Sequence, residues 1–239
     1  MNHTLSGSSV LVVGGAKNLG LAIARRADEL GASVVIGARD LQAATTAAAD
    51  LRSGRAVALD AADEESIARA AQQLGAVDHI ISTAAAHHNV PVAELDHDAT
   101  VKAFEAKVIG PMLLAKHFAP QMPPTGSIIM FSGVAAWKPA SGFSVMGITN
   151  GAASFAAGHL AHELAPIRVN AVSPGIVDSG TWDGMPDADR AAFFDGAAAG
   201  TLAGRVGHVD DILNAVEWLL TAGYVSGETI HVEGGARSA

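Results

Sequence analysis

The glycine-rich segment GGAKNLG, residues 14–20, limits the possible folds of this chain more than any other feature. It follows a short apolar run at Val10–Val13 and leads directly into residues 19–30, where apolar side chains recur at helical spacing until Gly31. A strand, a tight turn and a helix N-terminus in this order direct backbone N–H groups and the positive end of the helix dipole toward a phosphate. Asn18 stands where such loops usually have their middle glycine, and asparagine enters the left-handed backbone region more readily than other side chains. The segment therefore predicts a phosphate-binding turn of the dinucleotide-binding kind that accommodates Asn18.

Short Val/Ile-rich runs alternate with Ala-rich segments of helical period along the rest of the chain. This alternation is typical of stacked βαβ units around a parallel sheet. We expect helices near residues 19–30, 63–74, 98–118, 147–164 and 208–221 and strands at Val10–Val13, Val34–Gly37, Ala56–Leu59, His79–Ser82, Ser127–Phe131, Arg168–Val172 and Thr229–Val232. A parallel sheet of seven strands needs helices on both faces. The sequence thus predicts an α/β fold with one doubly wound Rossmann domain over residues 1–239.

Residues 178–204 depart from this alternation. They have a Gly/Pro/Asp-rich entry, an Ala-rich middle and a glycine exit, which together indicate a small mobile helical insert. An insert after a late strand of a parallel sheet lies over the carboxyl ends of the strands, where ligands bind. We therefore expect residues 178–204 to form a lid.

Composition favours small-molecule chemistry over nucleic-acid or membrane binding. The net charge is −9, with 15 basic residues, whereas nucleic acid or an anionic membrane would require a clustered excess of Lys and Arg. The absence of cysteine excludes disulfides, thiolate metal sites and a Cys nucleophile, and the histidines lack metal-like spacing, so no metal site is expected. No apolar run reaches the roughly 20 residues of a membrane helix. The N-terminal residues do not resemble a signal peptide, so we expect a cytoplasmic protein.

The end of the second predicted strand, Gly37-Ala38-Arg39, indicates which dinucleotide binds. In dinucleotide-binding folds a carboxylate in this region accepts hydrogen bonds from the ribose hydroxyls. This segment has none; Arg39 offers a guanidinium fork to a 2′-phosphate, and Lys17 in the glycine loop offers a second cation. The alternative is that both residues are solvated surface cations. Their joint occurrence on two facing loops favours NADP(H) as the cofactor.

Further motifs follow in a fixed order toward the C-terminus. They are Asp60, Ser82-Thr83-Ala84-Ala85, Arg168-Val169-Asn170-Ala171-Val172-Ser173-Pro174-Gly175, Ser179, Gly204-Arg205-Val206-Gly207 and Val232-Glu233-Gly234-Gly235. With these residues the chain resembles the short-chain dehydrogenase/reductase family along nearly its whole length.

This resemblance implies a strand order of 3-2-1-4-5-6-7 with right-handed crossovers. It also implies a cofactor-binding set along the carboxyl ends of the strands. That set consists of Gly14, Lys17, Asn18, Leu19, Gly20, Arg39, Asp60, Ala61, Ala84, Pro174, Gly175, Ile176 and Ser179. The family further implies a homotetramer or homodimer, and small residues such as Gly151 and Gly158 in the helix near 147–164 would let a partner helix approach closely. Packing against the sheet is the alternative role for these small residues.

The family's usual catalytic side chains are replaced in this chain. The resemblance implies a Ser, a Tyr and a Lys, with an Asn on a neighbouring helix, for the reduction of carbonyls or oxidation of alcohols. The corresponding positions hold Gly133, Met146, Asn150 and Lys107, and Ser132 lies one residue before the serine position. The only tyrosine, Tyr224, lies in the C-terminal turn, where we expect it to pack beside the last strand. Because a thioether has no exchangeable proton and an amide is a poor base, hydride transfer lacks its usual general acid.

Four side chains remain as candidates for chemistry: Lys107, Ser132, Asn150 and His87. His87 follows the fourth strand and has an imidazole that titrates near neutral pH, although loop histidines are often merely solvated. Lys107 and Asn150 have exchanged residue types relative to the family, so an amine remains near the site. We expect Asn150 to hold Lys107 by a hydrogen bond, and the ammonium to stabilise an oxyanion or donate a proton. The alternative is drift after loss of activity, with Lys107 extending to solvent.

Three functions are compatible with these residues. The first is an NADP(H)-dependent oxidoreductase with an atypical acid, acting on an unassigned carbonyl or alcohol. The second is a noncatalytic NADP(H)-binding sensor or assembly partner, because a fold alone confers no chemistry. The third is a lyase or isomerase that uses the cleft without redox change.

Overall fold

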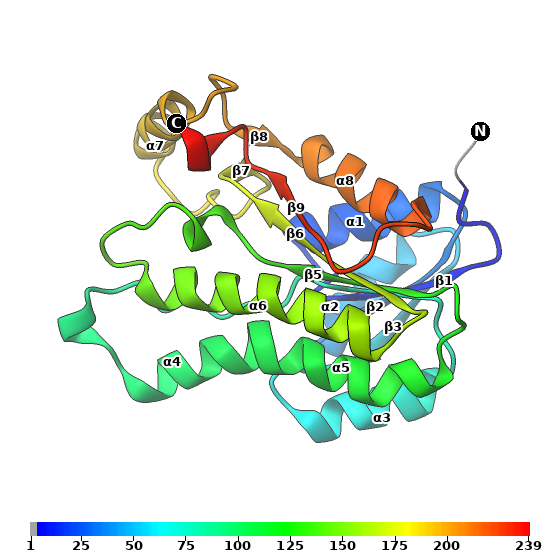
Figure 1. The fold of residues 1–239 in the computed structure, drawn as a ribbon. Helices are drawn as coiled ribbons and strands as arrows, with labels where there is room; N and C mark the ends of the chain where they lie inside the picture. The colour runs from blue at the N-terminus through cyan, green and yellow to red at the C-terminus, as the bar shows by residue number, and fades with distance from the viewer. Residues whose placement is uncertain (1–3) are drawn as a thin grey trace.

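The computed structural model describes residues 4–239, which form one seven-stranded parallel sheet between two layers of helices (Figure 1). The strands are β1 (Ser9–Val13), β2 (Ser33–Ala38), β3 (Gly54–Ala58), β4 (His79–Ser82), β5 (Ser127–Phe131), β6 (Arg168–Pro174) and β9 (Thr229–Val232). Their order in the sheet is β3-β2-β1-β4-β5-β6-β9, which confirms the predicted topology. Two short strands, β7 (Val177–Asp178) and β8 (Gly207–His208), form a separate parallel pair that the sequence analysis did not predict.

The central strands are apolar on both sides because helices cover both faces of the sheet. In β1, Val10 and Val12 belong to one core cluster, whereas Leu11 and Val13 belong to the other. The first cluster packs under α1 (Asn18–Glu29), α2 (Leu41–Ala49) and α8 (Val209–Thr221), and the second under α3 (Glu64–Leu74), α5 (Gly110–Phe118) and α6 (Ser144–Glu163).

Two helices differ from the sequence-based expectation. The α2 helix was not predicted because its short Ala/Thr-rich sequence has no clear apolar stripe; the Asp40 side chain caps it. The single helix expected near 98–118 is divided into α4 (His97–Phe104), a π-helical turn at Glu105–Ile109, and α5. Such π-helical turns occur frequently at functional sites.

The carboxyl ends of the strands gather the loops that carry the predicted site residues. Figure 1 shows α7 (Asp187–Ala199) and the C-terminus together at the end of the sheet toward which β6 and β9 run. The α7 helix has no fully buried residue, and its exit is held by a hydrogen bond of 3.0 Å from Lys138 Nζ to Gly200 O. A helix with so little buried surface opens at low cost in free energy. Among residues 4–239, no helix is long and apolar enough to cross a membrane.

Candidate functional site

The glycine loop between β1 and α1 has a backbone that only small residues permit. Gly14 has a φ of +82° and Asn18 a φ of +49°, so Asn18 does adopt the left-handed conformation that the loop requires. A Cβ at Gly14 would lie 2.7 Å from Thr83 Oγ1, and a Cβ at Gly20 would overlap Gly14 O. Glycine is therefore required at both positions, and the loop packs tightly against the end of β4. Its N–H groups and the N-terminus of α1 face the space in which a pyrophosphate would bind.

Two cations flank this loop. Lys17 and Arg39 are both exposed, and neither forms an ion pair within residues 4–239. Asp40, which follows Arg39, is committed to α2: its Oδ1 accepts hydrogen bonds from Gln42 N at 2.9 Å and Ala43 N at 3.1 Å. The carboxylate next to Arg39 in the sequence is thus engaged by the helix, and the two cations have no ion-pair partner among the described residues.

The other residues expected at the cofactor also lie at the carboxyl edge. Asp60 Oδ1 accepts a hydrogen bond of 3.0 Å from Ala62 N and so shapes the turn after β3. Gly175 packs on Glu233, where a Cβ would lie 3.0 Å from the Glu233 Cα. The Ser179 hydroxyl lies 3.2 Å from Thr181 Oγ1 in the segment that follows β7. Leu19 lies at the start of α1, Ala61 after β3, Ala84 after β4, and Pro174 and Ile176 at the end of β6.

Ser132 and Asn150 lie close together, and both are buried where α6 packs against β5. Ser132 is 3% exposed, and its hydroxyl donates to Asn150 O at 2.8 Å. The Ser154 hydroxyl in turn donates to Ser132 Oγ at 2.8 Å. Sequence reasoning missed Ser154; its only signal is its position one helical turn after Asn150. The Ser132 hydroxyl therefore links α6 to the end of β5 through two hydrogen bonds.

The amide of Asn150 occupies the space that a side chain at position 133 would need. A Cβ built on Gly133 would lie 2.7 Å from Asn150 Nδ2. Asn150 is itself 2% exposed, and its Oδ1 is buried without a hydrogen-bond partner in the structure. Glycine at position 133 and asparagine at position 150 are thus sterically coupled.

Lys107 has a different environment from Ser132 and Asn150. It lies half-buried on the π-helical turn, and desolvation lowers the pKa of its ammonium to about 8. The expected hydrogen bond with Asn150 is absent from the described chain, so that prediction is wrong for this structure. His87 is exposed after β4; desolvation and the charge of Lys107 both lower its pKa. The structure therefore shows no hydrogen bond between Lys107 and Asn150 within residues 4–239, and the charge of Lys107 instead lowers the pKa of His87.

The remaining aromatic and histidine residues correct or extend the sequence analysis. Tyr224 does not pack beside the last strand: it is 103% exposed in the turn between α8 and β9, because no element covers that turn. His231 on β9 contacts Trp137 edge to face, with a centroid distance of 4.5 Å. His79 is buried, with its Nδ1 2.9 Å from Ser127 Oγ. Within residues 4–239, no cluster of His, Asp and Glu could hold a metal ion.

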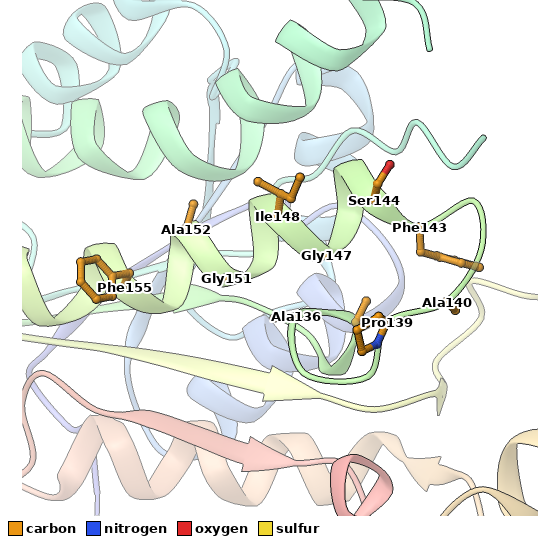
Figure 2. A pocket seen from close by; sticks show the side chains of 11 residues that line it. Ala136, Pro139, Ala140, Phe143, Ser144, Gly147, Ile148, Gly151, Ala152 and Phe155 are labelled. Atoms are coloured by element: carbon orange, nitrogen blue, oxygen red, sulfur yellow. The ribbon is translucent and has the colours of Figure 1, made fainter. Parts of the chain in front are cut away.

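A shallow groove of about 730 Å³ runs along the outer side of α6. Figure 2 shows the side chains of Ile148 and Ala152 pointing from the same side of this helix, with Gly147 and Gly151 leaving gaps beside them. Ile148 and Phe155 are 60% and 74% exposed. This surface combines protruding apolar side chains with glycine gaps on the same helix face.

Comparisons with known proteins agree with this arrangement. The sequence model of a family described as enoyl-(acyl carrier protein) reductase matches residues 14–237. An uncharacterized oxidoreductase of Methylorubrum extorquens is 32% identical over 248 residues, covering 98% of this chain and 99% of the relative. A short-chain dehydrogenase/reductase of Acremonium sp is 30% identical over 250 residues, covering 95% of this chain and 94% of the relative.

A solved structure supports the same grouping. The crystal structure of a small-chain dehydrogenase in complex with NADPH is similar with a TM-score of 0.82 and 29% identity, covering 97% of this chain and 99% of the other. The similarity thus extends over the glycine loop, the carboxyl edge of the sheet and the lid segment alike. This chain belongs to the short-chain dehydrogenase/reductase family.

Proposed function

We propose that this protein is an NADP(H)-dependent oxidoreductase of carbonyl or alcohol substrates in which Lys107 replaces the usual tyrosine as the proton donor. The observation that carries this proposal is the state of Lys107. Among the four positions that correspond to the family's catalytic residues, it alone holds an ionisable side chain. It lies desolvated on the π-helical turn that packs against α6, without an ion pair or hydrogen bond within residues 4–239.

The nucleotide part of the proposal rests on the glycine loop and the two free cations. Glycine at positions 14 and 20 lets the loop pack tightly on itself and on Thr83. A tight glycine turn before a helix N-terminus is the arrangement that binds a pyrophosphate through backbone N–H groups. Arg39 and Lys17 supply positive charge for a 2′-phosphate, while the Asp40 carboxylate is held by α2. The solved relative with bound NADPH supports the same choice of nucleotide.

The chemical part requires a group that can both hold and release a proton near neutral pH. When bound, NADPH supplies a hydride to a carbonyl carbon. The Lys107 ammonium stabilises the negative charge that develops on the carbonyl oxygen and then transfers a proton to it. A pKa of about 8 suits this role, because the ammonium is the major form at pH 7 and still releases its proton readily. In this proposal Lys107 regains its proton from solvent.

A noncatalytic NADP(H)-binding protein is the second candidate, and one observation favours it. Ser132 and Asn150 are sealed between β5 and α6, so two of the four expected catalytic candidates serve packing instead. In that case the lid would report nucleotide binding to a partner rather than enclose a substrate. The lid over residues 178–204 and the cytoplasmic location remain predictions from the sequence under either function.

One paired experiment separates the two candidates. Calorimetric titration with NADPH and NADH is combined with NADPH oxidation against a panel of aldehydes and ketones, using wild type, Arg39→Ala and Lys107→Met. We expect tighter binding of NADPH than NADH, a loss of about tenfold or more in NADPH affinity for Arg39→Ala, and turnover that Lys107→Met abolishes. Binding without turnover on any substrate would favour the noncatalytic candidate, and equal affinity for both nucleotides would contradict the role of Arg39.

We also propose that the groove on α6 is a contact between two copies of this chain. A protruding side chain such as Phe155 and a gap at Gly151 on the same helix give a self-complementary surface, as a twofold interface requires. A Cβ at Gly151 would meet only the Ala136 Cβ at 3.9 Å, so Gly151→Leu is expected to fold while obstructing the partner. Sedimentation should show a dimer or tetramer for wild type and a smaller species for the variant. Gly184→Leu is the matched control, since no atom lies within 4 Å of its Cβ position.

A further inference from the structure

Two buried polar atoms on neighbouring strands have no hydrogen-bond partner within residues 4–239. They are Ser173 Oγ on β6 and His231 Nδ1 on β9. Ser173 is 0% exposed, and it is paired with His231 in the parallel ladder that joins these two strands. Paired residues of adjacent parallel strands are about 5 Å apart and direct their side chains to the same face of the sheet. The hydroxyl group and the imidazole ring are therefore neighbours, although no hydrogen bond joins them.

This pairing distinguishes the two atoms from the other buried side-chain atoms without a partner in the described chain. Those are Ser82 Oγ, Ser144 Oγ and Asn150 Oδ1. Ser82 is paired with Met130 and not with a polar residue, and the other two residues lie on α6. A single unsatisfied polar atom is costly to bury, and two on paired residues indicate that one small polar ligand satisfies both.

The hydroxyl on the β5 side of Ser173 is already committed. Ser132 lies next to Ser173 because the ladder of β5 and β6 pairs the residues that immediately precede them. The Ser132 hydroxyl donates to Asn150 O and accepts from Ser154 Oγ, both at 2.8 Å. A hydroxyl has one proton to donate, so Ser132 cannot also donate to Ser173.

The groups around His231 are committed as well. The Glu233 carboxylate accepts a hydrogen bond of 3.1 Å from Arg237 N and lies 3.4 Å from the Arg237 Nε. The ring of Trp137 packs edge to face on the His231 ring, with a centroid distance of 4.5 Å and an interplanar angle of 80°. An aromatic ring covers part of the imidazole without satisfying its buried nitrogen. No side chain described here thus supplies the missing hydrogen bond to Nδ1.

We propose that Ser173 and His231 hold one buried water molecule between β6 and β9. Two hydrogen bonds of about 2.8 Å through a single water span the spacing of about 5 Å between paired residues. Water is the ligand of choice because ordered water commonly satisfies buried polar atoms that have no protein partner. A water can donate to one of the two atoms while it exchanges a second hydrogen bond with the other.

The water positions more than the two residues that bind it. It fixes the His231 ring on which Trp137 packs, and Trp137 belongs to the loop that follows β5. The next residue in this loop, Lys138, donates a hydrogen bond of 3.0 Å to Gly200 O at the end of α7. The buried water therefore supports the contact between the loop after β5 and the segment that carries α7.

A high-resolution crystal structure of the wild-type protein without nucleotide tests the proposal directly. We expect one ordered water within about 3.2 Å of both Ser173 Oγ and His231 Nδ1. A direct hydrogen bond between the two side chains overturns the proposal, and so does the lack of ordered water density between them.

Thermal unfolding of Ser173→Ala provides a second test. The variant removes one of the two protein groups that hold the water, so Tm should fall by about 2–6 °C. If the hydroxyl were instead buried without any partner, its removal would raise Tm. An unchanged or higher Tm thus contradicts the proposal. Ser141→Ala is the matched control: Ser141 is exposed in the loop before α6, and its replacement should change Tm by less than about 1 °C.

Ring ¹⁵N chemical shifts of His231, measured by NMR on protein labelled at histidine, separate a water-mediated link from a purely local effect of Ser173. We expect one ring tautomer in wild type at neutral pH, with Nδ1 in a hydrogen bond. Ser173→Ala should shift the Nδ1 signal, whereas Ser141→Ala should leave it unchanged. An identical His231 spectrum in wild type and Ser173→Ala would mean that the serine does not act on the imidazole, and would overturn the proposal even if Tm falls.

Discussion

Replacing Lys107 by methionine should stabilise the protein at neutral pH, although the substitution removes the residue that the proposed function makes the proton donor. Methionine keeps much of the length and apolar volume of the lysine stem without the charge. In the folded chain the ammonium is desolvated and has no counter-charge, whereas in the unfolded chain water solvates it fully. The variant therefore removes an electrostatic penalty of folding and little else.

The size and pH dependence of this effect follow from the pKa of Lys107. Its folded pKa of about 8 lies below the ordinary 10.5, so between these values the unfolded state binds more protons and stability rises with pH. The full difference corresponds to at most about 3 kcal/mol, and solvent screening of a half-buried amine reduces it to about 1–2 kcal/mol. The penalty is fully present below pH 8 and disappears as the pH approaches 10.5. Lys107→Met should thus be more stable than wild type at pH 7 and about equally stable above pH 10.

Urea unfolding at pH 7 and pH 10, followed by circular dichroism, measures this difference directly. Lys102→Met is the matched control, since Lys102 is exposed on the neighbouring helix and its replacement should change stability by less than about 0.5 kcal/mol. A Lys107→Met variant that is less stable than wild type at both pH values would refute the reasoning. That result would mean that the amine makes a stabilising contact in the folded state.

Three other perturbations test separate parts of the structure. Burial lowers the pKa of His79 from the ordinary 6.5 to about 4, so the unfolded state binds a proton more readily below pH 6.5. Wild type should therefore lose up to about 3 kcal/mol of stability between pH 6.5 and pH 4. In urea titrations His79→Gln should show a weaker pH dependence of stability over this range. Gly133→Ser should destabilise the protein by about 1–3 kcal/mol, because the new side chain would collide with Asn150. The double variant Gly133→Ser/Asn150→Ala should recover at least about 1 kcal/mol of this lost stability, as measured by thermal unfolding. Gly20→Ala should weaken NADPH binding about tenfold or more in calorimetry, because its Cβ would overlap Gly14 O. Gly223→Ala, in the turn between α8 and β9, should bind NADPH like wild type, since no atom lies within 4 Å of its Cβ position.

The fold was predictable from the sequence because its signals are local and repeated. Each apolar strand and each helix with an apolar stripe can be recognised from its own short stretch of sequence, and the glycine loop marks where the first β-α crossover begins. The elements that were missed lack such signals: α2 is short and weakly patterned, and β7 pairs with β8 across the whole lid segment. The exposure of Tyr224 was also unpredictable, because local sequence does not show which turns remain uncovered.

The site was less predictable, because side-chain direction depends on contacts between distant elements. Lys107 and Asn150 were expected to form a hydrogen bond because the family resemblance implies that their residue types are exchanged. In the structure the Asn150 amide turns toward Gly133, and Lys107 interacts electrostatically with His87 on a third segment. The sequence gives no signal for the roles of Gly133 and Ser154. Those roles depend on the packing of α6 against β5, which places Gly133 against the Asn150 amide and Ser154 against the Ser132 hydroxyl.

The contrast between these two groups of residues bears on whether the site is used. The hydroxyl groups of Ser132 and Ser154 have stabilising hydrogen bonds that explain their presence without any chemistry. Lys107 has no such contact: burial disfavours its charge, and an apolar residue of similar length would be more stable at the same place. A desolvated charge without a structural partner is a feature that functional sites share, because a reactive amine needs exactly the environment that stability opposes. Of Lys107, Ser132 and Ser154, Lys107 is therefore the residue whose presence the proposed function explains best.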